Sequence, residues 1–198
     1  MTTKKTNYLL PFILVTTLFF LWGIANNLNG ILIPQLRKAL LLSNMQSTFV
    51  DTAIYFAYFI TALPAGWVLK QYGYKKGIIT GLIVFSAGCF LFIPAALTRT
   101  YGLFLTGLFI IGCGLTMLET AANPYAAQLG DEETATSRLN LAQSFNGLAV
   151  FIAPLIGTFF ILSGTSFSNE ELTAMTETSR NTYLDQEAGS VILPYAFL

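Results

Sequence analysis

Long runs of apolar residues alternate with short polar segments along the chain. The runs cover about residues 9–33, 49–69, 77–97, 101–127 and 139–162, and a sixth begins at residue 191. An α-helix needs about 20 residues to cross the roughly 30 Å hydrocarbon core of a bilayer. The first five runs are therefore predicted to be transmembrane helices. The segment from Val191 to Leu198 is too short to cross, so we expect a chain truncated within its sixth helix.

The fourth run contains a carboxylate, Glu119, about five residues past its middle. An ionised carboxylate facing lipid at this depth costs several kcal/mol, so the side chain must face protein or a wet cavity. At helical spacing Thr116, Glu119 and Asn123 share one polar stripe. A structural hydrogen bond between helices is one interpretation. We favour the other, a substrate or proton site.

Polar amides also lie inside the first and fifth runs. In the first run, Asn26 and Asn29 share a helix face with Trp22. In the fifth run the amides are Asn140, Gln143 and Asn146. Each amide alone is as typical of an interhelical hydrogen bond as of a ligand contact. Their stacking over two turns favours the wall of a cavity.

The overall composition supports a membrane protein and excludes several functions. Only 10% of the residues are charged and 54% are hydrophobic, whereas soluble domains carry about 25% charged residues. The formal net charge is zero with scattered basic residues, so we expect no nucleic-acid partner. There is no histidine, no nucleotide-binding or nucleophile motif and no metal-ligand cluster, while Cys89 and Cys113 lie in apolar runs. We therefore expect neither an enzyme nor a cofactor or metal.

Lysine and arginine positions indicate the orientation. With the N-terminus inside, six basic residues fall on the cytoplasmic side and four opposite, and the turn Gly66–Lys76 is notably basic. The six include Lys4 and Lys5. We predict a multi-pass protein of the inner (plasma) membrane with a cytoplasmic N-terminus.

A faint symmetry relates the two halves of the span series. Pro34 follows an Asn-containing patch in span one, and Pro124 follows one in span four. Pro34 is expected to end or kink its helix. Pro64 and Pro154 each precede a glycine in spans two and five. This pattern indicates an inverted three-plus-three repeat with a binding site near the membrane midplane.

The polar side chains together fit a neutral polyhydroxylated ligand. Amides pair donors and acceptors with neighbouring hydroxyl groups, and Trp22 can stack on the apolar face of a sugar ring. The spans contain no arginine or lysine to neutralise an anion, and Glu119 is the natural proton carrier.

Three segments resemble the fucose–galactose–glucose:proton symporter family of the major facilitator superfamily: residues 19–29, 119–124 and 138–146. The resemblance implies twelve helices in two six-helix halves, of which this chain is the N-terminal half. It also implies that Glu119 is the family's intramembrane glutamate, and that Gln143 and Asn146 are its sugar-contacting amides.

The chain departs from the family at two positions. Lys70 replaces an Asp of the superfamily's loop motif. A fucose-transporting member carries an Asp directly after Asn-Asn-Leu-Asn, where this chain has Gly30. This favours glucose, galactose or N-acetylglucosamine over L-fucose, and the coupling ion is a proton or sodium.

Asp51 has two interpretations. It lies at a similar depth to Gly30 across a short loop, so it can supply the absent carboxylate in proton coupling. Alternatively it is a helix N-terminal acid, or a partner of Arg37 or Lys38.

The sequence thus predicts an all-α membrane protein that takes up a neutral hexose-type sugar by cation symport, with a proton favoured, through alternating access. Its expected partners are the sugar, the coupling ion, the lipid bilayer and a missing C-terminal half. A non-transporting membrane sugar sensor or assembly subunit with the same fold is the alternative.

Overall fold

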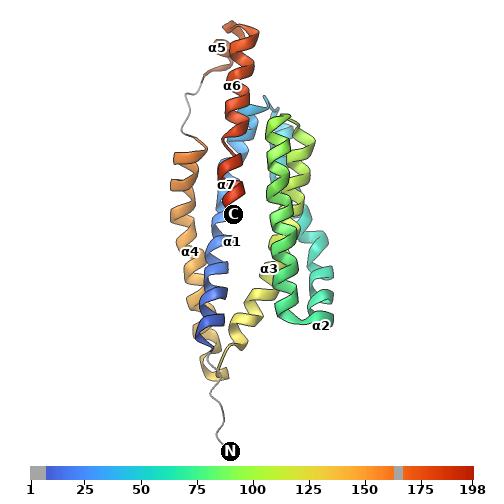
Figure 1. Ribbon diagram of the computed structural model, residues 1–198, viewed down its shortest axis with the longest axis vertical. Coiled ribbons are helices and arrows are strands. Elements are labelled where there is room, and N and C mark those ends of the chain that lie inside the picture. The colour runs from blue at the N-terminus through green and yellow to red at the C-terminus, as the bar shows by residue number, and fades with distance from the viewer. Residues whose placement is uncertain (1–7, 163–166) are drawn as a thin grey trace, which may run out of the picture.

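The computed structural model describes residues 8–162 and 167–198, a part of the chain that is helical throughout (Figure 1). Lys4 and Lys5 lie outside the described residues. The elements are α1 (Leu9–Ala39), α2 (Asn44–Leu97), α3 (Tyr101–Gln128), the 3₁₀ helix η1 (Glu132–Thr134), α4 (Ala135–Phe160), α5 (Asn169–Ala174), α6 (Glu177–Gly189) and α7 (Ile192–Phe197).

Helix α2 contains both the second and the third predicted span. Its helical geometry is interrupted at Gly73, where φ is 78° and ψ is 169°. This left-handed backbone conformation carries no side-chain penalty for glycine. Figure 1 shows α2 descending to the lower end of the molecule and returning, and Gly77 packs against the Leu69 side chain across the turn. The chain therefore reverses direction at Gly73.

Pro34 does not end α1, which continues to Ala39. A proline removes one backbone donor but leaves the later turns free to bond, and Leu40 N lies 2.9 Å from Leu36 O. Arg37 and Lys38 consequently occupy the last turn of α1 instead of a loop, where positive charge is favoured by the helix dipole.

The long helices pack as two pairs, α1 with α4 and α2 with α3. Each pair meets at a glycine. A Cβ atom on Gly23 would lie 2.8 Å from the Ala149 Cβ, and one on Gly112 would lie 2.8 Å from the Ala57 Cβ. In an inverted repeat, spans one, two and three correspond to spans four, five and six. A contact between spans one and five therefore has its counterpart in a contact between spans four and two. The observed pairing follows this rule.

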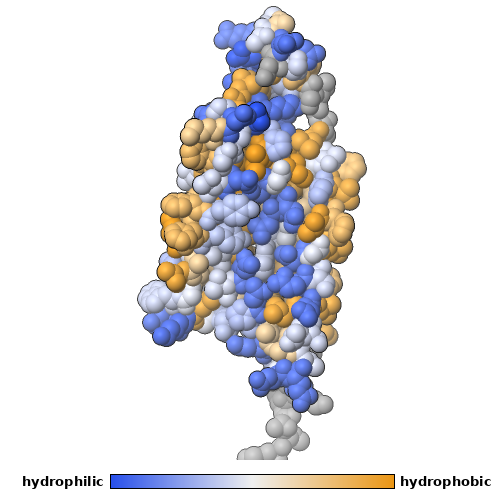
Figure 2. All heavy atoms as spheres, turned by 180° about the vertical axis from the view of Figure 1, so that it is seen from behind, coloured by the Kyte–Doolittle hydropathy of each residue, from blue (hydrophilic) through white to orange (hydrophobic). Residues whose placement is uncertain are grey.

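Four helices of the described part, α1, α2, α3 and the η1–α4 segment, are long and apolar enough to cross a membrane. Large apolar side chains cover the outside of the bundle, with Phe59 80% and Leu63 85% exposed. Figure 2 shows hydrophilic side chains gathered along the centre of one face, between apolar flanks. The fold therefore presents apolar side chains to lipid and a polar strip along one face.

Helix α6 is docked against the ends of α1 and α2. Lys38 Nζ lies 2.7 Å from Glu187 Oε1, and Arg99 Nε lies 2.9 Å from Asp185 Oδ1. The buried amide of Gln35 donates to the Glu187 backbone carbonyl at 2.9 Å. These contacts connect α6 to both helix pairs.

Candidate functional site

Glu119 lies partly buried on α3, where side chains of three helices meet. The Tyr58 hydroxyl of α2 donates a hydrogen bond to the Glu119 carboxylate, and the Asn26 amide of α1 donates to the Tyr58 oxygen. The sequence predicts Asn26 and Glu119 as site residues but not Tyr58. The available signal was its helical spacing, because Asp51, Tyr55 and Tyr58 share one face of α2.

Two cavities share Tyr58 and Glu119 as lining residues. One has a volume of 310 Å³ and is lined by Asn26, Asn29, Ile54, Tyr55, Tyr58 and Glu119. The other has a volume of 430 Å³ and is lined by Tyr58, Ala62, Thr116, Glu119, Thr120 and Asn123. Both volumes fall within the roughly 300–1,000 Å³ of small-molecule sites. The Tyr58–Glu119 pair therefore lines both cavities, of which the first lies between the two helix pairs and the second on the α2–α3 pair alone.

The polar stripe of α3 is held by hydrogen bonds within the helix. Thr116 Oγ1 donates to the Gly112 carbonyl at 2.7 Å, and Asn123 Nδ2 donates to the Glu119 carbonyl at 3.0 Å. The Asn123 side-chain oxygen then accepts a bond from Gln143 Nε2 of α4 at 3.0 Å. Gln143 does not line the 430 Å³ cavity itself, but it is bonded to Asn123, which does.

The other two amides of α4 lie outside the cavities. Asn146 Nδ2 donates to the Phe19 backbone carbonyl of α1 at 3.0 Å, so in this conformation it connects two helices. Asn140 is exposed and lines neither cavity. Of the three predicted α4 residues, Gln143 alone contacts a cavity-lining side chain through a hydrogen bond of the described residues.

Trp22 is buried in the core instead of lining a cavity. Its side chain is 5% exposed, and its ring centroid lies 4.7 Å from that of Phe19. The close approach of α4 at Gly23 covers this part of α1. Asn26, one turn later, is exposed and lines the 310 Å³ cavity.

Asn29 connects the first cavity to Asp51. Asn29 Nδ2 lies 3.2 Å from Asp51 Oδ1, and Asn29 also lines the 310 Å³ cavity. The interpretation of Asp51 as a helix N-terminal acid is wrong, because α2 begins at Asn44 with Ser43 as its N-cap. Lys38, its suggested alternative partner, forms its ion pair with Glu187.

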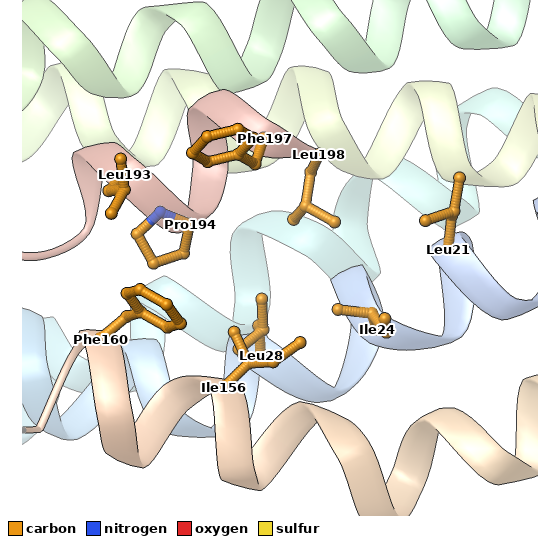
Figure 3. Close-up of a pocket in the computed structure, with 9 residues that line it drawn as sticks. All are labelled: Leu21, Ile24, Leu28, Ile156, Phe160, Leu193, Pro194, Phe197 and Leu198. Atoms are coloured by element: carbon orange, nitrogen blue, oxygen red, sulfur yellow. The ribbon is translucent and has the colours of Figure 1, made fainter.

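A further pocket, between α1, α4 and α7, has a different character (Figure 3). Its volume is 310 Å³, and all nine lining residues are apolar, among them Leu28, Phe160 and Phe197. It offers no side-chain hydrogen-bond partner for a hydroxylated ligand. Within residues 8–162 and 167–198 no three His, Cys, Asp or Glu side chains are grouped to hold a metal ion.

Known proteins are similar to this chain in sequence and in fold. The family model described as Major Facilitator Superfamily matches residues 14–169. The L-fucose-proton symporter of Escherichia coli is 46% identical over 196 residues, which cover 98% of this chain and 45% of that protein. The glucose/galactose transporter of Brucella abortus is 44% identical over 197 residues, covering 100% of this chain and 44% of the relative.

Two solved structures have a fold similar to that of this chain. The crystal structure of the E. coli fucose:proton symporter matches with a TM-score of 0.83 and 45% identity, covering 96% of this chain and 46% of that one. A Major Facilitator Superfamily transporter in the outward conformation matches with a TM-score of 0.82 and 46% identity. The chain thus spans a little under half the length of the relatives it matches.

Proposed function

Because the chain belongs to the Major Facilitator Superfamily, we propose that it supplies one helical half of a secondary transporter that couples uptake of a neutral hexose-type sugar to a proton. The observation that carries the proposal is the position of Glu119. This titratable side chain is bonded to Tyr58 and lines both polar cavities of the bundle. In this role Glu119 binds the proton, and the surrounding hydroxyl and amide groups bind the sugar.

The chemistry of the cavity walls supports a neutral sugar. Amide and hydroxyl groups of Asn26, Asn29, Thr120 and Asn123 line the cavities and offer both donors and acceptors. Neither cavity has an arginine or lysine among its lining residues, so a phosphate or carboxylate ligand would lack a counter-charge. The related proteins are named as L-fucose-proton symporters and glucose/galactose transporters. We propose a hexose of this group.

Position 30 favours glucose, galactose or N-acetylglucosamine over L-fucose. Gly30 is exposed and has no side chain to offer a sugar hydroxyl. The nearest substitute on the neighbouring helix is Asp51, which reaches α1 through its bond to Asn29. We assign Asp51 a supporting role in coupling and Glu119 the principal one.

The proton and the sugar would act together in alternating access. Protonation of a Glu119 carboxylate oxygen removes a charge that is costly at membrane depth, and it converts that oxygen into a hydrogen-bond donor. Movement then requires a second helix bundle against which this one can rock. The polar strip along one face in Figure 2 is the surface we assign to that contact.

We propose an inner (plasma) membrane location with the N-terminus on the cytoplasmic side. The N-terminal end of α1 and the basic turn of α2, with Lys70, Lys75 and Lys76, lie at the same end of the molecule (Figure 1). Basic residues concentrate on the cytoplasmic side of membrane proteins.

The proposal is tested by transport in a fusion, here called the joined protein, in which this chain replaces the matching segment of the E. coli symporter. Reconstituted in liposomes with a pH gradient, it should accumulate one of glucose, galactose, N-acetylglucosamine or L-fucose in a saturable manner. A sensor would bind the sugar without moving it. The 198-residue chain alone is the control, and it should not accumulate sugar because it supplies one bundle only.

A further inference from the structure

A separate pocket lies at the end of α1 opposite the N-terminus. Its volume is 490 Å³, and it is formed by the end of α1, the segment that follows it, and residues of α5 and α6. Three of its lining residues are basic, Arg37, Lys38 and Arg180, and none is acidic. It shares no lining residue with the two cavities around Glu119.

The positive charge of this pocket comes mainly from two arginines. Lys38 is already neutralised, because its Nζ lies 2.7 Å from a carboxylate oxygen of Glu187. Arg180 Nε is buried and has no hydrogen-bond partner among the described residues. Leaving such a donor unpaired is unfavourable, and the same arginine lines the pocket. Arg37, in the last turn of α1, is exposed and lines the pocket too.

No acidic side chain of α5 or α6 in the described part of the chain accepts a hydrogen bond from Arg180 Nε, and three of them have other partners. Asp185 pairs with Arg99, and Glu187 pairs with Lys38. Glu171 accepts the backbone N–H of Ser168, and this bond lowers the pKa of its carboxyl. None of these carboxylates lines the pocket.

The depth of the pocket matches the headgroup layer of a bilayer. Helix α1 spans Leu9–Ala39, so its midpoint is Ile24, and Arg37 lies 13 residues beyond that midpoint. At about 1.5 Å per residue this is roughly 20 Å from the centre of a membrane in which α1 is centred. The hydrocarbon ends at about 15 Å and the headgroups at about 20–22 Å from that centre.

We propose that this pocket binds the phosphate group of an anionic phospholipid. Guanidinium groups offer planar pairs of donors that match phosphate oxygens, and Arg37 and Arg180 would contact the phosphate from two helices. The apolar lining residues Leu41, Leu42, Phe167 and Leu172 then contact the glycerol and upper acyl chain of the lipid. Basic pockets between membrane helices bind acidic headgroups on the cytoplasmic side of membranes, and this pocket would use the same chemistry at the opposite surface.

Native mass spectrometry of the purified 198-residue chain tests this site. The chain is mixed with phosphatidylglycerol or phosphatidylcholine that carry identical acyl chains. We expect at least fivefold more bound phosphatidylglycerol. The variant Arg37→Gln with Arg180→Gln should lose this preference, and the single variant Arg37→Gln should reduce it. Both should keep the helical circular dichroism of the parent.

A matched control removes the same charge at the other end of the molecule, in Lys70→Gln with Lys75→Gln, whose side chains are exposed. This variant should keep the full preference. Equal binding of the two lipids, or equal loss in both double variants, would overturn the proposal. Displacement of phosphatidylglycerol by millimolar inorganic phosphate would also overturn it, because the ligand would then be a free anion.

Discussion

Asn29 Nδ2 on α1 lies 3.2 Å from Asp51 Oδ1 on α2, so one hydrogen bond connects a cavity-lining amide to a second carboxylate. Asp51 lies two turns inside α2, where it cannot serve as a cap. We expect Asp51→Asn to reduce sugar accumulation by the joined protein about tenfold, because a hydrogen bond to a charged group contributes roughly 1.5–3 kcal/mol. The measurement is gradient-driven uptake at matched amounts of reconstituted protein.

A second substitution separates a coupling role of Asp51 from a structural one. A Cβ atom on Gly30 would meet nothing within 4 Å, so an aspartate fits there. Adding Gly30→Asp to Asp51→Asn should restore part of the accumulation. Normal accumulation in the Asp51→Asn variant would reject the role of Asp51.

Tyr58→Phe removes the hydroxyl that donates to Glu119 and keeps the ring. We expect sugar accumulation to fall by about 10-fold or more, because the carboxylate loses a charge-assisted hydrogen bond that orients it. Tyr72→Phe is the matched control, since Tyr72 is exposed near the α2 turn. Similar uptake rates in the two variants would show that the Tyr58 hydroxyl is not needed.

Gly114→Ala tests the close packing of α2 against α3. A Cβ atom at this position would lie 2.5 Å from the Phe85 backbone nitrogen, so the helices must separate. We expect a loss of roughly 1–3 kcal/mol in the free energy of unfolding. Gly102→Ala on the same helix meets nothing within 4 Å and should leave stability unchanged or slightly higher. Thermal unfolding in detergent compares the two, and equal midpoints would contradict the packing described.

Lys38→Met tests the docking of α6. It leaves the Glu187 carboxylate, which is 5% exposed, without its ion-pair partner. Breaking a fully buried ion pair costs about 3–5 kcal/mol; Lys38 is partly exposed, so the loss should be smaller than this but still lower the unfolding midpoint. Lys38→Met combined with Glu187→Gln should be more stable than Lys38→Met alone. If Lys38→Met alone is the more stable of the two variants, the Lys38–Glu187 pair does not hold α6 in place.

The membrane fold follows largely from the sequence. Apolar runs of about 20 residues predict spanning helices, and a carboxylate at the depth of Glu119 must face the interior. The helical stripe of Thr116, Glu119 and Asn123 does line one cavity. These features depend on local periodicity, which a single sequence displays directly.

Contacts between helices are harder to predict. Tyr58 shares a helix face with Asp51 and Tyr55, but this spacing alone does not identify a site residue until its partner on another helix is known. Trp22 is expected beside a sugar, but its side chain is buried with its ring against Phe19. Asn146 bonds the Phe19 carbonyl in the conformation described, and only the relative placement of α1 and α4 reveals this contact.

Glu119→Gln in the joined protein determines whether Glu119 carries the coupling proton. Glutamine keeps the shape and hydrogen bonding of the side chain but cannot bind and release a proton. The measurement compares gradient-driven sugar accumulation with sugar counterflow at equal pH on both sides. We expect accumulation to be abolished while counterflow persists, and undiminished accumulation by the variant would show that Glu119 is not the proton carrier.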